Sequence, residues 1–324
     1  MRGQLSKKGK YRGKEKFHLL PEYKLPKELE GVVRAIFDNK GCENVSLQIH
    51  KFVPFGYDNE KKKDGLPKPR YDKFGYKIEL PPKTLQEYQS FFHVQNKLWE
   101  FKGAEIFPEK TKSRLIVGLG DESVYETSIR LHRNYGVPYI PGSALKGITK
   151  HIVILKIAEK LQKHDKEKDF FELAKEVQDW FEGKGKLDEV KDCPIKVNGE
   201  ENSAEELRNI FGTQKQEGLI IFFDAFPDPE ELNSKPILEL DIMNPHYQPY
   251  YQGSPDPGDW HKPNPIFFLT VPTDIAFTFA VAHRNGDGKE PLGIEKKALF
   301  LLKEALKEIG VGAKTASGYG RFKL

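Results

Sequence analysis

Apolar and polar positions repeat with helical or strand periods over much of the 324-residue chain. Residues 44–55 alternate, which predicts a half-buried strand, whereas residues 84–101 have helical spacing. Apolar residues then recur every three or four positions from Leu145 to Ile157, which predicts a long, half-buried helix with Ser143 as its N-cap. Two further amphipathic helices are expected at 169–183 and 202–212, the second with a capping-box pattern.

Strand patterns fill most of the remaining chain. They cover residues 113–120, 218–226 and 236–243, two segments on either side of 272–274, and the end of the chain at 319–324. A strong amphipathic helix is expected at 294–309, with Gly310 directly after it. The order strand, helix, strand, strand, helix, strand predicts an α+β protein with a ferredoxin-like (RRM-like) βαββαβ core. We expect a basic N-terminal segment at 1–43 and one domain at 44–324, with large insertions at about 56–83 and 164–218.

Composition places the chain among globular proteins, with 38% hydrophobic and 31% charged residues. No apolar stretch is long enough for a membrane span, and residues 1–17 lack the apolar region of a secretory signal. The two cysteines, Cys42 and Cys193, suit a reducing compartment and exclude a disulfide framework. These features predict a cytoplasmic protein.

The net charge of +4 is small, but its distribution is uneven. Residues 1–30 and 51–83 are basic, and Tyr and Phe are interspersed among their lysines and arginines. Such segments suit a polyanion surface. An equally open interpretation is a solvated tail and loop.

The stretch GVGAKTASGYGRF, residues 310–322, contains four glycines and few residues that could form a core. Glycine permits positive φ and close approach of another surface, and such loops present backbone N–H groups to anions. The alternative is a tight helix-to-strand turn that needs glycines for geometry alone.

Together with IPGSALKG at 140–147, this loop resembles the RAMP superfamily, the RNA-binding proteins of CRISPR systems. The blocks at 118–151 and 243–271 are similar to the sixth-subunit family of the Cmr complexes of type III-B systems. The resemblance runs from about residue 44 to residue 324. It implies a non-catalytic backbone subunit, without a cofactor, that binds guide RNA near its 3′ end. The implied partners are guide RNA, target RNA and other Cmr subunits, including the backbone and terminal RAMP subunits.

Three groups of residues are then expected to contact RNA, through phosphate binding at backbone amides and cations and through stacking on Tyr319. They lie before the long helix, at its start and in the glycine loop: Arg130, His132, Arg133, Ser143, Lys146, Lys150, Gly312, Lys314, Ser317, Gly318, Tyr319 and Arg321. An ordinary helix start with solvent-exposed lysines is the plainer alternative for the second group.

A proline-rich loop carries aromatic residues that predict a recognition surface for RNA or a neighbouring subunit: His246, Tyr247, Tyr250 and Trp260. Packing of the loop on its own aromatics is equally open. His246, Asp259 and His261 match no common zinc spacing, so we expect no metal. Asp121, Glu122 and Glu126 do not stand out as a two-metal nuclease site.

Two other functions stay open. One is a metal-independent CRISPR RNA-processing endoribonuclease, with His132 or His50 in general acid–base catalysis. The other is an architectural protein that contacts subunits only.

Overall fold

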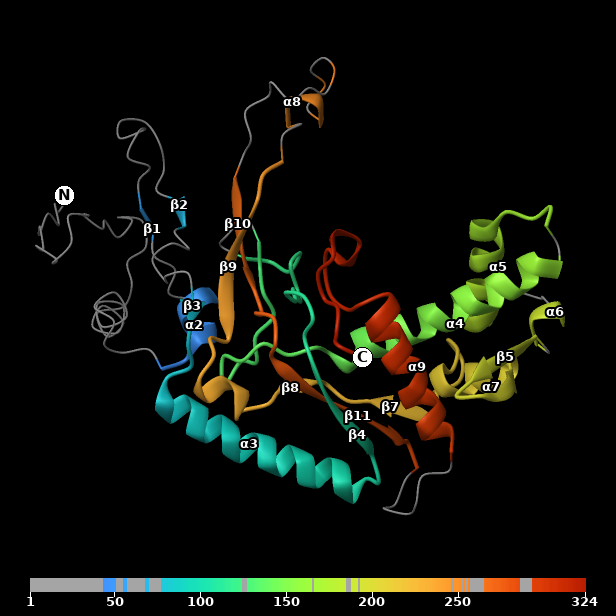
Figure 1. Cartoon of the computed structure of the whole chain (residues 1–324), viewed down its shortest axis with the longest axis horizontal. Coiled ribbons are helices and arrows are strands. Elements are labelled where there is room, and N and C mark those ends of the chain that lie inside the picture. The colour runs from blue at the N-terminus through green and yellow to red at the C-terminus, as the bar shows by residue number, and fades with distance from the viewer. Residues whose placement is uncertain are drawn as a thin grey trace, which may run out of the picture.

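The computed structural model describes residues 43–50, 55–56, 68–69, 77–123, 127–164, 166–184, 188–191, 193–245, 248–251, 253, 256, 265–285 and 293–324. Figure 1 shows how the described elements are arranged. The helices are α2 (Val45–His50), α3 (Pro82–Phe101), α4 (Gly142–His164), α5 (Phe170–Glu182), α6 (Asp188–Lys191), α7 (Ala204–Phe211), α8 (Gln248–Tyr251) and α9 (Ile294–Glu308), with 3-10 turns η2 (Glu231–Asn233) and η3 (Thr315–Ser317). The strands are β1 (Phe55–Gly56), β2 (Lys68–Pro69), β3 (Lys77–Ile78), β4 (Glu105–Lys110), β5 (Pro194–Val197), β6 (Glu200–Ser203), β7 (Ile220–Phe222), β8 (Phe226–Pro227), β9 (Leu238–Met243), β10 (Ile266–Thr270) and β11 (Ala276–His283).

An antiparallel sheet with the strand order β4–β11–β7 forms the centre of the molecule, and β8 also pairs with β11. Phe279 lies opposite Phe107, and Val281 lies opposite Phe222. The end of the chain returns beside β4, where Thr111 pairs with Phe322 in an isolated bridge. Every residue of β11 from Ala276 to Ala282 is buried. Its apolar run, interrupted only by the buried Thr278, is what a strand covered on both faces requires.

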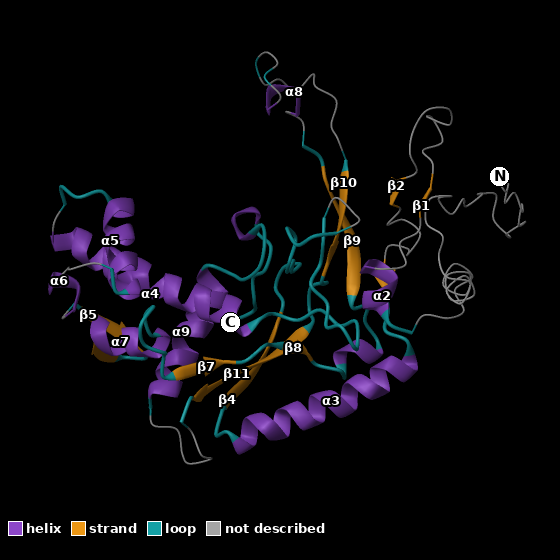
Figure 2. Ribbon diagram, turned by 180° about the vertical axis from the view of Figure 1, so that it is seen from behind, coloured by secondary structure: helices purple, strands orange, loops and turns teal. Residues whose placement is uncertain are grey.

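Helices cover both faces of this sheet. On one face α9 packs on β11 and β4, with the Lys303 ammonium 4.7 Å from the centre of the Phe107 ring. On the other face α3 contacts the segment around β8, where Trp99 and Phe91 lie against Phe223 and Phe226. Figures 1 and 2 show α3 running along one side of the sheet, with α4 and α9 away from it.

The long hairpin of β9 and β10 projects from the body and carries α8 at its tip (Figure 1). With β3 it forms a separate three-stranded antiparallel sheet in the order β10–β9–β3. Ile242 and Phe267 face each other across the two strands, and each is 44% exposed. The predicted strand at 236–243 and the two strands around 272–274 are therefore confirmed as β9, β10 and β11.

Residues 164–218 form a lobe of helices and one small hairpin beside α4 (Figure 1). α5 starts after the cap residue Asp169 and ends at Gly183, which has a φ of 82°. The predicted capping box of α7 is present, because the Ser203 and Glu206 side chains each accept from the other's backbone N–H. The β5–β6 hairpin turns at Asn198 and Gly199, which both have positive φ, as a two-residue type I′ turn demands.

The predicted strand at 44–55 is wrong, because Val45–His50 form helix α2. Asn44 caps this helix by accepting the Leu47 amide on its side chain, at 3.1 Å. Val45 and Ile49, one helical turn apart, are both buried, whereas Leu47 is 40% exposed. The helix thus buries Val45 and Ile49, whereas a strand would have buried Leu47 as well.

The predicted strand at 113–120 is also wrong. Only Leu115 pairs there, in an isolated bridge with Val271, and Gly118 has a φ of 76° that ends extended structure. The strand that pairs with the centre of the sheet is β4, five residues upstream of Leu115, which the sequence patterns did not predict.

Ser143 is not the N-cap of the long helix, because α4 begins one residue earlier, at Gly142. The Pro141 carbonyl accepts the amides of Ala144 and Leu145, and the Asp224 carboxylate accepts the Gly142 amide at 2.7 Å. Asp224 therefore satisfies an amide of the first turn, and Ser143 is exposed within that turn.

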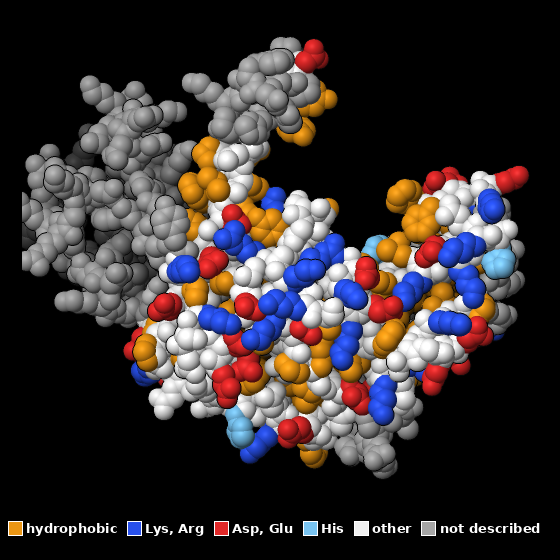
Figure 3. Space-filling model, viewed as in Figure 1, with side chains coloured by type: hydrophobic (Ala, Val, Ile, Leu, Met, Phe, Trp, Pro, Cys, Tyr) orange, Lys and Arg blue, Asp and Glu red, His pale blue; other side chains and the backbone are white. Residues whose placement is uncertain are grey.

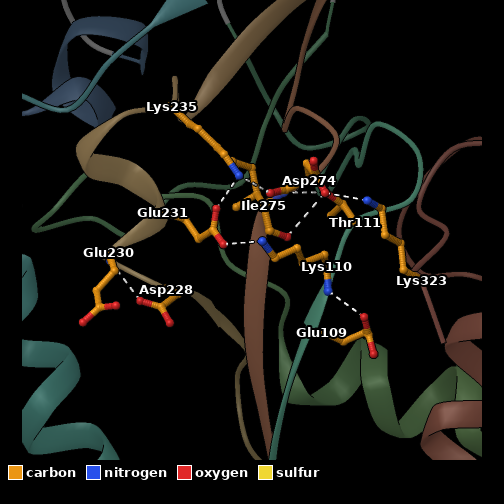
Figure 4. A network of polar contacts seen from close by, with 10 residues as sticks. All are labelled: Glu109, Lys110, Thr111, Asp228, Glu230, Glu231, Lys235, Asp274, Ile275 and Lys323. Atoms are coloured by element: carbon orange, nitrogen blue, oxygen red, sulfur yellow. Dashed lines mark hydrogen bonds and ion pairs between the residues drawn. The ribbon is translucent and has the colours of Figure 1, made fainter.

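A network of ion pairs ties the end of the chain to the sheet (Figure 4). Glu231 accepts from both Lys110 and Lys235, while Lys323 pairs with Asp274 in the turn before β11. Burial acts to raise the pKa of Glu231, but the hydrogen bonds from the two lysines outweigh it and lower that pKa. The hydrogen bond from Lys323 likewise lowers the pKa of Asp274.

The prediction of a mixed α and β protein is confirmed, and every pair of strands in the described residues is antiparallel. Within the same residues, no helix combines the length and apolarity that a bilayer crossing needs. The basic segment at 1–42 and most of 51–76 lie outside the described residues.

We expect Tyr88→Phe to destabilise the fold, because the buried Tyr88 hydroxyl donates to the Pro227 carbonyl at 2.5 Å and joins α3 to β8. Removing the donor leaves a buried carbonyl without that partner, at a cost of about 1–3 kcal/mol. Denaturant unfolding measures the loss, and Tyr251→Phe, at a residue 79% exposed, is the matched control. Equal stability of the two variants would contradict the anchoring role.

Candidate functional site

The glycine loop after α9 is tied to the segment that follows β4. The Ala313 amide donates to the Ile116 carbonyl and the Gly320 amide donates to the Arg114 carbonyl, each at 2.8 Å. The loop also closes on itself, because the Val311 amide donates to the Gly320 carbonyl at 3.0 Å. The position of the loop is therefore set by backbone hydrogen bonds at both of its ends.

The four glycines of the loop do not share one role, although all have positive φ. A Cβ on Gly312 would lie 2.1 Å from the Ile116 carbonyl oxygen, and one on Gly320 would lie 2.0 Å from that of Val311. A Cβ on Gly310 would lie 2.8 Å from the Gly320 oxygen. Among the four glycines, only Gly318 has open space where a Cβ would lie. The close approach at Gly312, expected for RNA, is thus made by the chain's own backbone.

The outer turn of the loop, Lys314–Gly318, is the part that faces outward. Lys314 has a φ of 58°, and the 3-10 turn η3 follows it directly. The successive amides of Lys314, Thr315 and Ala316 make no hydrogen bond to any described residue, and Ser317 and Gly318 are exposed. Successive amides in a left-handed-to-right-handed turn form a concave site for anions. Lys314, which has no ion-pair partner among the described residues, adds a positive charge there.

Tyr319 and Arg321 are engaged within the protein. The Tyr319 hydroxyl donates to Asp241 of β9 at 2.9 Å, and its ring meets Phe268 edge to face. Burial first, and then this hydrogen bond, raise the pKa of Tyr319. Arg321 donates to the carbonyls of Lys307 and Glu308 at the C-terminus of α9. Both side chains therefore hold the loop in place.

Lys146 and Lys150 lie one turn apart on α4, and both are half-buried. Neither makes an ion pair with a described residue. Burial lowers the pKa of each, and neighbouring cations lower it further: Arg284 acts on Lys146, and Lys146, Arg208 and Lys184 act on Lys150. The acidic residues Glu217 and Glu182 offset part of this effect.

The segment before α4 is largely structural. Arg130 binds the Asp121 carboxylate through two nitrogens, at 2.6 and 3.1 Å. His132 lies in an aromatic cluster, stacked on Tyr135 at 5.0 Å, and burial lowers the pKa of its imidazole. Its Nδ1 accepts the Asn134 amide at 3.3 Å. Arg133 is exposed and makes no ion pair with a described residue.

The recognition loop is described only in part. His246, Tyr247 and Trp260 lie outside the described residues. Tyr250 is 48% exposed and meets Tyr251 edge to face, at the tip of the β9–β10 hairpin. The described part of the chain holds no cluster of three metal-ligating side chains.

Sequence patterns missed the cations that the fold brings to Lys146 and Lys150. They are Lys184 after α5, Arg208 on α7 and Arg284 after β11. No short-range motif connects them, because they lie far apart in the chain. On the face drawn in Figure 3, Lys and Arg side chains, with Asp and Glu among them, cover the middle of the molecule between the hairpin arm and the helical lobe; the picture does not distinguish individual residues.

Residues 110–323 match the family model of the RAMP superfamily, so the chain belongs to that superfamily. Within it, the chain is 48% identical to the CRISPR system Cmr subunit Cmr6 of Pyrococcus furiosus over 265 residues, which is 76% of this chain and 75% of the relative. The crystal structure of Cmr6 from Pyrococcus furiosus matches with 51% identity over 68% of this chain and 97% of that one, with a TM-score of 0.45. A chain of the cryo-EM structure of the Type III-B Cmr-beta bound to cognate target RNA matches with 19% identity over 94% of this chain and 77% of that one, with a TM-score of 0.46.

Gly312→Ala and Gly318→Ala should separate the two roles of glycine in the loop. Both positions have a φ of 92°, where a Cβ costs about 1–2 kcal/mol. Gly312→Ala adds a clash with the Ile116 carbonyl, so we expect it to lose clearly more stability than Gly318→Ala. Denaturant unfolding of the two variants tests this. A Gly318→Ala variant less stable than Gly312→Ala would contradict the assignment.

Proposed function

We propose that this protein is a non-catalytic, guide-RNA-binding backbone subunit of a type III-B Cmr RNA-targeting ribonucleoprotein, placed near the 3′ end of the guide RNA. The identity to Cmr6 over three quarters of each chain supports the kind of complex. The observation that carries RNA binding is the outer turn of the glycine loop. It combines three unbonded successive amides, exposed residues and Lys314 on a rigidly held base.

This geometry suits a phosphodiester backbone and does not suit base recognition. Amides and ammonium groups bind phosphate oxygens, which are the same for every sequence. Tyr319, which could otherwise stack on a base, is held by Asp241 and Phe268. The subunit would therefore hold guide RNA of any sequence, and base pairing of the guide would select the target RNA.

We propose further that the core is ferredoxin-like. The order β4, α4, β7 with β8, β11, α9 and the C-terminal bridge reads βαββαβ along the chain. The neighbours in space are Phe322, β4, β11 and β7, all antiparallel. In this arrangement the glycine loop is the connection between the second helix and the last strand.

The surroundings of His132, one of the two candidate catalytic histidines, support a non-catalytic role. His132 packs among aromatic rings, and its Nδ1 accepts a hydrogen bond from the Asn134 amide. Burial also lowers its pKa, which disfavours the protonated form that a general acid needs. We expect the purified protein to leave CRISPR repeat RNA intact in EDTA, and a defined cut would contradict this proposal.

Lys314→Glu should weaken RNA binding by at least about tenfold without loss of the fold, because it places a negative charge beside the three open amides. Fluorescence anisotropy with a labelled single-stranded RNA measures the affinity, and thermal unfolding checks the fold. Lys296→Glu is the control for the charge change, since Lys296 is an exposed lysine on α9, outside the loop. Equal affinities of the two variants would show that the loop is a structural turn only.

Lys146→Ala combined with Lys150→Ala should lower both the RNA affinity and its salt dependence. Each phosphate contact of a single strand contributes about 0.7 to the slope of log K against log salt, so two lost contacts reduce it by about 1.4. Titrations at several salt concentrations give the slope. An unchanged slope would mean that the two lysines do not contact phosphates.

A further inference from the structure

A second cluster of cations lies between α4 and the lobe formed by residues 164–218. Lys146 and Lys150 come from α4, while Lys184 and Arg208 come from the lobe. Arg284, at the end of β11, completes it. The carboxylates that act on these cations are fewer: Asp179, Glu182 and Glu217.

The lobe holds its cations by specific packing. The Arg208 guanidinium lies 4.5 Å from the centre of the Trp180 ring, which orients its plane. Its Nε is buried and has no acceptor among the described residues. Lys184 follows Gly183 directly, and Gly183 lies so close to Arg208 that a Cβ would be 3.3 Å from its Nη2. Arg208 and the start of the Lys184 segment are thus held side by side.

The acidic neighbours do not neutralise the cluster. Lys184 pairs with Glu182 at 2.6 Å, and Arg284 pairs with Glu217 at 3.3 Å. Lys146, Lys150 and Arg208 make no ion pair with a described residue. Half-buried, unpaired cations that repel one another destabilise the protein when no ligand is bound. An anion bound among them removes this destabilisation.

Lys150 of this cluster and the α9 contact lie on different sides of α4. Lys156, six residues after Lys150, binds Glu304 of α9 at 2.6 Å. Six residues correspond to about 240° around a helix, so Lys150 lies about 120° from the side of α4 that carries Lys156. Ser143 and Gly147, in the first turns of α4, are exposed.

We propose that the cluster is a second phosphate-binding site, in which Arg208 and Lys184 of the lobe join Lys146 and Lys150 to bind a phosphodiester of an RNA strand. A planar guanidinium with free N–H donors matches two phosphate oxygens, and the lysines add point charges. The identification of the ligand as RNA rests on the proposed function. The lobe is then a part of the RNA path and not only a structural insertion.

The test uses the full chain and a labelled single-stranded RNA, with substitutions confined to the lobe. We expect Arg208→Gln to weaken binding about tenfold, the loss typical of one charged hydrogen bond. Lys184→Gln should weaken binding less, because Lys184 shares its charge with Glu182. The double variant should lower the salt slope by about 1.4. Lys175→Gln is the matched control, because Lys175 is an exposed lysine on α5.

Thermal unfolding separates binding from folding, since Arg208 also packs on Trp180. If Arg208→Gln unfolds, Arg208→Lys and Lys184→Gln carry the test, and both should still bind more weakly than the control. Affinities and slopes equal to those of Lys175→Gln would overturn the inference while the proposed function stands. Absence of RNA binding by the unmodified chain would overturn both. Pyrophosphate serves as a second probe, for a small phosphate ligand. If the lobe variants lose pyrophosphate binding but keep their RNA affinity, the ligand of the cluster is a small phosphate and the inference is overturned.

Discussion

The return of the chain end to the segment after β4 is the constraint on which the rest of the structure depends. The Lys112 amide donates to the Arg321 carbonyl, and the Lys323 amide donates to the Lys110 carbonyl. These bonds place Phe322 in the core against Phe277 and Phe279. Because α9 ends only fourteen residues before Phe322, the intervening loop must turn sharply within a short length. The glycines, Arg321 and Tyr319 all serve that turn, which fixes the outer residues Lys314–Gly318 in space.

A glycine-rich loop can thus be a packing device and a binding site at once. Gly310, Gly312 and Gly320 let backbone pass close to backbone inside the loop, whereas the space around Gly318 is open. The same division holds for the side chains. Arg321 and Tyr319 form internal hydrogen bonds, and Lys314 does not. Under the proposed function, rigid support and an unbonded outer turn together would form a preorganised anion site, which loses little conformational entropy on binding.

Sequence patterns predicted the elements whose signals are local. The caps of α5 and α7 and the positive-φ glycine after α9 can be read from a few neighbouring residues. The strand at 44–55 failed because Val45 and Ile49 satisfy both periods, and burial decided for the helix. β4 carries Pro108, which disfavours a strand, and only its pairing with β11 makes it one. The turn at Asn198–Gly199 had a clear hairpin signal that could have been used.

The site shows the same limit. The loop and the start of α4 are contiguous motifs, so their residues could be named from the sequence. Arg208, Lys184 and Arg284 could not, because only the fold brings them beside Lys150 and Lys146. Their arrangement changes what α4 does in the molecule. One side of this helix packs on α9, which leads into the glycine loop, and Lys150, about 120° around the helix from Lys156, meets the cations of the lobe. If both proposed sites bind phosphates, the rigid helix α4 between them fixes the spacing of those phosphates, and an RNA strand of any sequence would be held with the same geometry.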